Sequence, residues 1–463
     1  MRADLLASTP DGLDEAVAAV DAFDQALVAG LVRPQPAQAA GLAHLAEAVA
    51  GTPLASRVAE AAEKAAAGVA GEDHFVVLAA ARSALLGAVH DALMVQVHGA
   101  TGRPVSAPEP VLATGRDVAR NLLTAARSWL SDLARAGWQG LDSDVVAGSV
   151  QVVSAMLADP SLRRLAVLLD GFAAELAASC PGAAMERFPA RRWADLWSRA
   201  LLLTLPGGLA ATASANATGR LLPLGIDLQE HATAVQAQVH AVFEPADGTQ
   251  PRLVRASVSA PKPDTIIGAG LWQMLRPHMS LINAVSDGRA MELTGMPLTA
   301  EGDLIWSDEH ARRGDPADPF ATARVVLPTA AYAPAAPLGR HPASIAVPVF
   351  LEGYAVGKDD DALTLTVAGH PLTVDADRMP VAGPLTPQAI AASGACIGLL
   401  RWDNGAFRVQ PLAVETTVKK KVAAVHAGAW AGGTTDKDGV KAEKAATEAI
   451  VVLVERAGRL LRK

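Results

Sequence analysis

The sequence predicts an α+β protein of several domains: an N-terminal α-helical bundle, an antiparallel β-rich barrel or sandwich, and a C-terminal amphipathic helix. Three observations lead to this prediction. The first half is rich in alanine and carries leucine and valine at helical spacing. After residue 219, apolar and polar residues alternate along short runs, and the last residues return to a helical stripe. At 463 residues, we expect domains over 1–205 and 219–427 and a tail helix over 436–463.

The N-terminal half is expected to form a series of helices. Asp11 can cap the first helix, and Pro34 ends it. The run 75–97 is apolar on most sides, which predicts a central buried helix. The last helix of this half should end near residue 205, because a proline and two glycines follow it. Further helices are predicted from residue 42 and over 59–67, 118–136, 144–157 and 161–178.

Alternation of apolar residues predicts the strands of the second half. Residues 234–243 place every second side chain on one apolar face, and 253–258 fits a partner strand. Asn404–Gly405 between two apolar runs is the sharpest hairpin signal, because both residues tolerate positive φ. A second hairpin is expected around the loop 357–361. We also expect a short helix over 271–281 and a short strand over 323–327.

The C-terminal tail differs from the rest of the chain in charge. The whole chain carries a formal net charge of -8, yet residues 419–463 hold ten basic and five acidic side chains. Lys419–Lys421 opens this basic stretch, and a helix with apolar residues along one face follows. The acidic body should repel nucleic acid and acidic membrane surfaces, whereas the tail could attract an acidic partner or another copy of itself.

Composition argues against secretion, membrane insertion and cofactor chemistry. The longest plain apolar run, 449–454, is far shorter than the ~20 residues that span a bilayer. The two cysteines, Cys180 and Cys396, lie in different halves, so we expect a reduced, cytoplasmic compartment and no disulfide framework. Neither His-Glu-x-x-His nor Cys-x-x-Cys occurs, and Gln273 stands where a dinucleotide fingerprint needs its third glycine. No metal and no cofactor is therefore expected.

The segment 188–199 holds the densest group of tryptophan and arginine residues. On a helix, its two tryptophans lie on one side and its charged residues lie along another. Because tryptophan and arginine dominate interface energetics, we predict a protein-docking surface here. Its members are Arg191, Arg192, Trp193, Asp195, Trp197 and Arg199. The alternative is that both tryptophans belong to the core and that the aspartate pairs with its arginine neighbours.

A second polar cluster follows Trp306. It consists of Asp308, Glu309, His310, Arg312 and Arg313. In a cleft between the two halves, the first three side chains could perform acid–base chemistry while the arginines bind an anionic substrate. The alternative is a solvated helical face, on which the aspartate and the first arginine form an ordinary pair one turn apart.

The segment Arg191–Thr204, RRWADLWSRALLLT, resembles one in uncharacterised actinobacterial proteins. Those proteins are encoded beside a MoxR-type AAA+ ATPase, a von Willebrand A-domain protein and a SWIM zinc-finger protein. The resemblance covers this one helix. It implies a non-catalytic accessory protein of an ATPase-driven, chaperone-like assembly, and it carries over no catalytic residue.

The leading hypothesis is therefore a non-catalytic interaction component with protein partners, among them an AAA+ ATPase or a von Willebrand A-domain protein. The alternative is an enzyme that acts on a small anionic substrate at the cleft between the helical and β-rich halves. A homo-oligomer built through the tail helix is a third hypothesis.

Overall fold

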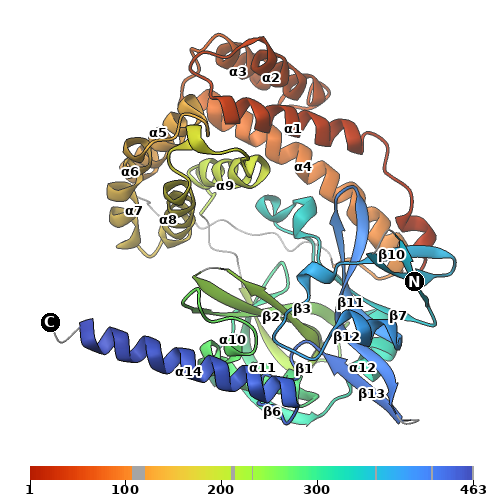
Figure 1. Ribbon diagram of the computed structural model, residues 1–463. Helices are drawn as coiled ribbons and strands as arrows, with labels where there is room; N and C mark the ends of the chain where they lie inside the picture. The colour runs from red at the N-terminus through yellow and green to blue at the C-terminus, as the bar shows by residue number, and fades with distance from the viewer. Residues whose placement is uncertain (107–119, 210–213, 232, 360–361, 419–420, 461–463) are drawn as a thin grey trace.

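The computed structural model describes residues 1–106, 120–209, 214–231, 233–359, 362–418 and 421–460. Helices occupy the first part of the chain, two mixed sheets follow, and a long helix ends it, so the protein is α+β (Figure 1). Lys419 and Lys420 of the basic stretch, most of the proline-rich connector after residue 106, and the tail residues 461–463 lie outside the described residues.

The helical half places its helices around one long helix, α4, which has 30 residues. The helices are α1 (Leu13–Ala29), α2 (Pro36–Ala48), α3 (Ala55–Ala66), α4 (Glu72–Thr101), α5 (Arg120–Ala136), α6 (Ser143–Ala147), α7 (Ser149–Leu157), α8 (Arg163–Ala178) and α9 (Ala190–Leu203). By length and composition alone α4 could cross a membrane, but 56% of its most apolar stretch is buried inside the fold. This burial is typical of a core helix.

The core of the helical half is built from leucine stripes with aromatic rings at its centre. Trp138, Trp193, Trp197, Phe23 and Phe172 are fully buried there and meet at tilted or edge-on angles. Aromatic rings each bury a large area, so these few rings compensate for the small area that the alanine-rich helices bury.

The first sheet has the strand order β1-β2-β3-β5-β4-β6, and β4 also pairs with β1. Its strands are β1 (Ser214–Glu230), β2 (Ala234–Pro245), β3 (Arg252–Pro261), β4 (Arg289–Thr299), β5 (Asp303–Leu304) and β6 (Ala311–Pro316). Helices α10 (Gly270–Met274) and α11 (Met279–Ser286) precede β4, and residues of both pack on the sheet.

The second sheet has the order β7-β11-β12-β10-β9-β8, and β13 pairs with β12 off this path. Its strands are β7 (Val347–Glu352), β8 (Ala355–Asp359), β9 (Ala362–Val367), β10 (His370–Val374), β11 (Ser393–Asp403), β12 (Ala406–Val418) and β13 (Lys421–His426). Asn404 with φ 50° and Gly405 with φ 78° form the turn between β11 and β12, which confirms the predicted hairpin.

Two predictions about the second half are wrong. The sheets are mixed, because β3 pairs with β5 and β10 pairs with β12 in parallel, and among the described residues neither sheet forms a closed barrel. Residues expected as a strand at 323–327 instead overlap helix α12 (Pro319–Val325). Asp318 caps this helix by accepting from the Phe320 amide, and Pro319 occupies its first position, where proline is favoured.

The two halves share a hydrophobic core. The second half of α4 contributes Leu93 and Val97 to a buried cluster that also contains Val349 of β7 and Leu400 of β11. A smaller cluster lies between the two sheets, with residues of β1, β11 and α12. Helix α4 therefore belongs to both halves, and it fixes where the second sheet lies relative to the helices (Figure 1).

Helix α14 (Lys437–Leu460) packs on the fold through its first half. Gln273 of α10 donates to the Glu443 carbonyl at 3.3 Å and to Thr447 Oγ1 at 3.0 Å, and Ala446 is buried beside Gly270. The second half of the helix extends past the first sheet (Figure 1). Its described side chains are exposed or only half-buried.

Candidate functional site

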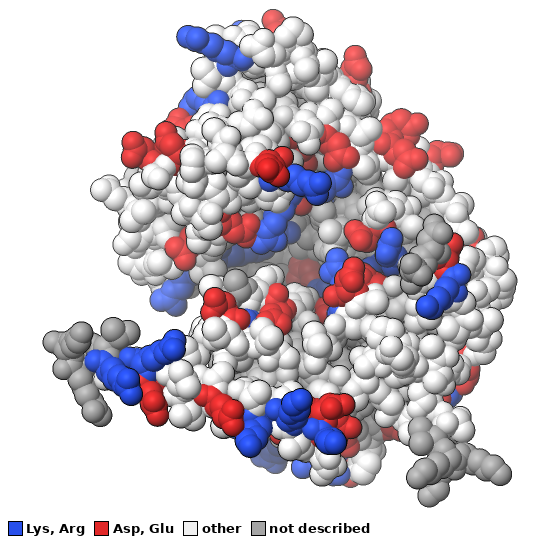
Figure 2. Space-filling model, viewed as in Figure 1, with Lys and Arg blue, Asp and Glu red and all other residues white. Residues whose placement is uncertain are grey.

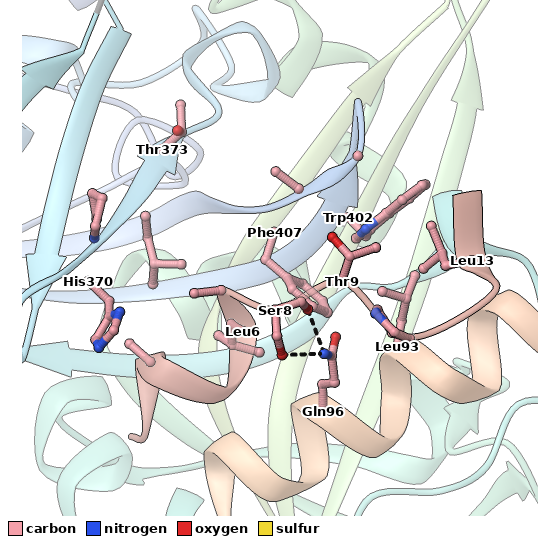
Figure 3. A pocket seen from close by; sticks show the side chains of 17 residues that line it. Leu6, Ser8, Thr9, Leu13, Leu93, Gln96, His370, Thr373, Trp402 and Phe407 are labelled. Carbon is pink, nitrogen blue, oxygen red and sulfur yellow. Dashed lines mark hydrogen bonds between the residues drawn. The ribbon is translucent and has the colours of Figure 1, made fainter. Parts of the chain in front are cut away.

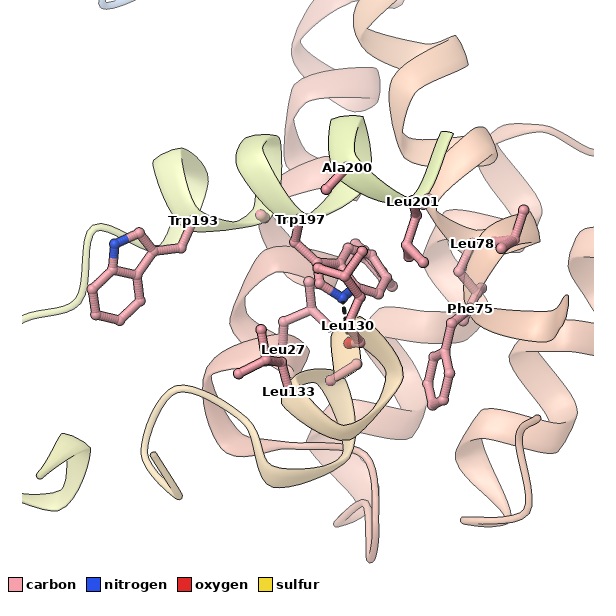
Figure 4. Close-up of a cluster of buried hydrophobic side chains, with 14 of the residues drawn as sticks. Leu27, Phe75, Leu78, Leu130, Leu133, Trp193, Trp197, Ala200 and Leu201 are labelled. Atoms are coloured by element: carbon pink, nitrogen blue, oxygen red, sulfur yellow. Dashed lines mark hydrogen bonds between the residues drawn. The ribbon is translucent and has the colours of Figure 1, made fainter. Parts of the chain in front are cut away.

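The two tryptophans predicted for a docking surface lie in the helical core. Trp193 is 1% exposed and Trp197 is fully buried, and the Trp197 indole N–H donates to the Leu130 carbonyl at 2.8 Å (Figure 4). Both rings lie on the face of α9 that meets the other helices, because that face carries the apolar residues of the segment. Neither ring is available to a partner, so only the polar residues of this segment reach the surface.

The polar side of α9 holds the helix to its neighbours. Arg191 pairs with Asp21 of α1, and Arg192 binds Glu175 of α8 through two nitrogens. Arg199 donates to the Leu338 carbonyl at 2.8 Å, which belongs to the loop before the second sheet. Each of these arginines therefore has an intramolecular partner in the fold, and together they tie α9 to two helices and to the β-rich half.

Asp195 takes part in a buried network around Arg82 of α4. The Arg82 guanidinium donates to both carboxylate oxygens of Asp24, at 2.6 and 2.8 Å, and to Asp195 at 2.6 Å. His341, from the loop before the second sheet, approaches Asp195 at 3.2 Å through Nε2. Burial raises the pKa of Asp24 to about 6 against the effect of Arg82. Burial also opposes ionisation of Asp195, but His341 and Arg82 together lower the pKa of its carboxyl.

This network joins helices α1, α4 and α9 to the loop at His341, and it lies where the two halves meet. Its cation is 1% exposed and holds two carboxylates. Breaking such a pair leaves a buried charge without its partner and is strongly destabilising. The polar residues of α9 therefore have a structural role, because they hold this helix to its neighbours.

The cluster after Trp306 is spread over two short elements instead of lining a cleft. Asp308 begins a 3₁₀ turn and accepts from Ser280 and from the Trp306 indole, the latter at 2.9 Å. His310 Nδ1 approaches the Thr294 carbonyl at 2.8 Å. Glu309 lies in the same turn and is exposed.

The two arginines of this cluster lie on strand β6. Arg312 is in register with Glu292 of β4, and Arg313 pairs with Asp287. Strand β6 lies at the lower end of the molecule, away from helices α5 to α9 (Figure 1). The structure thus places the five residues at an exposed sheet edge. An enzyme site was expected at the junction of the two halves, and these residues lie away from it.

The last turns of α14 expose a run of apolar side chains. Val451, Val452 and Val454 are 51%, 45% and 66% exposed. Arg456 and Arg459 follow on the next turn and are also exposed, and basic side chains gather at this end of the helix (Figure 2). We call the run Ala449–Arg459 the free half of α14.

Two cavities lie where the halves meet. One, of 220 Å³, is bordered by the N-terminal segment, α4, strand β10 and the β11–β12 hairpin (Figure 3). There Gln96 donates to the Ser8 carbonyl at 2.7 Å. The other, of 350 Å³, lies between the end of α4 and strand β7, and Arg103 lines it. Among the described residues, no three His, Cys, Asp or Glu side chains gather closely enough to hold a metal ion.

No protein-family model, no curated protein and no solved structure matches this chain.

Arg103 could not be identified as a site residue from the sequence. It is a single arginine in a proline-rich connector, and it has no patterned neighbours in the sequence. The free half of α14 had a signal in the sequence, because its apolar run and basic end are contiguous there.

Proposed function

We propose that this chain is a non-catalytic interaction component that binds a protein partner through the free half of α14. The observation that supports the proposal is the exposed apolar run Ala449–Val454. Three of its valines are 45–66% exposed, whereas the first half of the same helix packs on α10.

The run Ala449–Val454 has the apolar composition that is typical of a buried helix. It is apolar around most of its circumference, and a helix of that kind is normally buried. Valine loses side-chain freedom in a helix, and an isolated helical segment this short is marginal in water. A partner surface that covers the valines would remove apolar area from water and stabilise the segment at the same time.

Charge favours an acidic partner. Arg456 and Arg459 lie beside the valines, and the C-terminal stretch is the basic part of an otherwise acidic chain. Complementary charge would orient the partner and speed its association. The resemblance of Arg191–Thr204 supplies the class of partner proposed, which is an AAA+ ATPase or a von Willebrand A-domain protein that presents an acidic groove.

The test is affinity purification of the tagged full-length chain from its native host. We expect an AAA+ ATPase or an A-domain protein to co-purify in stoichiometric amount. The double variant V451D/V454D should lose that partner, because two carboxylates would be buried against an acidic surface. The matched control is V167D, which places the same charge on a valine of α8 that is 63% exposed. It should retain the partner.

Two outcomes would contradict the proposal. One is recovery of the wild-type chain as a lone monomer. The other is a concentration-dependent dimer in light scattering that V451D/V454D converts to monomer, because a second copy of the chain would then be the occupant of this surface.

A further inference from the structure

Arg103 is a buried cation that has no anionic partner among the described residues. The residue is 6% exposed, and its Nη1 atom is buried with no hydrogen-bond partner. Among the described residues, none forms a salt bridge with it. Burial lowers the pKa of Arg103 to about 10, which reflects the cost of holding this charge away from water.

The other two arginines that are buried in the described part of the chain, Arg82 and Arg401, are paired with carboxylates. Arg82 holds Asp24 and Asp195, and Arg401 donates to Asp227 at 2.8 Å and to Gln410 at 2.5 Å. Buried charges in proteins are normally paired in this way. Among the described arginines that are buried, Arg103 alone departs from this rule, so an anion from outside the chain is the natural complement.

The backbone holds Arg103 in place from both sides. Helix α4 ends just before it, at Gly102 with φ 66°. Just after it, Ser106 donates to the Tyr332 carbonyl at 2.8 Å and the Tyr332 amide donates to Pro104 at 2.9 Å. The backbone on both sides of Arg103, which lines the cavity, is therefore held in place, and a fixed backbone is part of the preorganisation that a binding site needs.

The cavity has the shape and chemistry of a small-molecule site. Its volume of 350 Å³ falls at the lower end of the usual range for ligand pockets, about 300–1,000 Å³. Arg103 and Thr101 line it, and Leu327, Val349 and Phe350 supply apolar surface. An unpaired guanidinium beside apolar side chains suits a ligand with an anionic head and an apolar body.

The other charged side chains at the cavity limit how many negative charges the ligand can carry. Arg324 also lines the cavity, but Glu352 and Glu415 already hold it. Glu352 would repel a second negative charge on a ligand. A single unpaired guanidinium matches a carboxylate, which it can bind through two parallel hydrogen bonds.

We infer that the cavity beside Arg103 binds a small organic monocarboxylate whose apolar body packs on Leu327, Val349 and Phe350. The inference does not depend on α14 or on any partner protein. It assigns this part of the molecule to sensing or carrying a small acid.

The first test compares three probes on the full-length protein by titration calorimetry. Benzoate has the required carboxylate and apolar ring, benzamide is its neutral counterpart, and inorganic phosphate is an anion without an apolar body. We expect benzoate to bind at least tenfold more tightly than benzamide, and phosphate to bind more weakly than both. Equal affinity for benzoate and benzamide, or no binding of benzoate, would overturn the inference.

The second test removes the charge with R103M. Benzoate affinity should fall at least tenfold while benzamide affinity stays the same, and the thermal midpoint without ligand should not fall, because the variant removes an unpaired buried charge. R220M is the matched control, since it removes an exposed arginine that pairs with Glu244. An equal loss of benzoate in R220M would mean an adventitious ion only. A fall of the R103M midpoint by more than about 5 °C would show that Arg103 has a structural partner.

Discussion

At the scale of single residues, His240 is the clearest departure from ordinary pairing besides Arg103. It lies on β2, is fully buried, and neither ring nitrogen has a hydrogen-bond partner. Burial lowers the pKa of His240 to about 3, and the charges of Arg255 and Arg401 act in the same direction against that of Asp227. The folded protein therefore keeps this ring neutral at pH values where an unfolded chain would protonate it.

This difference makes stability depend on pH. An unfolded histidine titrates near pH 6.5, so between pH 6.5 and about 3 the unfolded chain binds a proton that the folded chain refuses. Stability is then lost as the pH falls, by about 1.4 kcal/mol per unit, or roughly 2 kcal/mol at pH 5. Asp24, whose pKa is raised to about 6, contributes in the opposite direction between pH 7 and pH 5. Urea unfolding at the two pH values should therefore show that H240L changes the pH dependence of the wild type in favour of stability at pH 5, by roughly 2 kcal/mol.

H44L is the control for that experiment, because His44 is an exposed histidine on α2. It should keep the wild-type dependence on pH. The same slope in H240L and wild type would show that other groups carry the dependence.

At the scale of elements, α14 divides into a packed half and a free half. The contacts of Gln273 and the burial of Ala446 hold the helix before residue 448, and the exposed valines lie after it. The division locates the stabilising contacts of the helix in its first three turns.

Truncation tests that division. Removal of residues 449–463 should change the free energy of unfolding by less than about 1 kcal/mol, because mostly exposed side chains are lost. Removal of 436–463 should cost more, because it also removes the side chain of Ala446 from α10. Equal losses in the two truncations, measured by urea unfolding, would show that the free half packs on the fold in solution.

Elements with strong local signals could be predicted from the sequence. The apolar run 75–97 lies within α4, and Asn404–Gly405 forms the expected turn. Strand β1 could not be foreseen in full, since it contains Pro223 and Gly225 at a bulge and depends on partners on both sides, β2 and β4. The parallel pairings also arise from contacts between distant segments, which no local pattern records.

Candidate sites were harder to predict for the same reason. The pattern in 188–199 correctly separates an apolar from a polar face, but only tertiary contacts decide that the tryptophans are core and that the arginines have internal partners. Arg103 can be recognised as a site residue only in the folded protein, where Tyr332 and strand β7, which are far along the chain, lie near it.

At the scale of the whole molecule, α4 unites the two halves. Phe75 and Leu78 lie in the helical core, while Leu93 and Val97 lie in the core shared with the second sheet. We expect L93A to cost about 2–5 kcal/mol, because it removes buried methyl groups from a packed interior.

Because the core is shared, that loss should reach both halves. Hydrogen exchange measured by mass spectrometry should accelerate in peptides of α9 and of β11 by similar factors. V167A, at an exposed position of α8, should leave both unchanged. Acceleration confined to β11 would mean that the halves unfold independently.

The continuity of α4 also limits how the molecule can move. Its 30 residues form a rod of about 45 Å that passes through both bodies. Many two-part proteins open like a clamshell by turning a flexible joint. Here such a joint would have to form inside an intact helix, at the expense of its hydrogen bonds. Molecules should therefore reach the cavities between the halves without a clamshell opening of the two bodies.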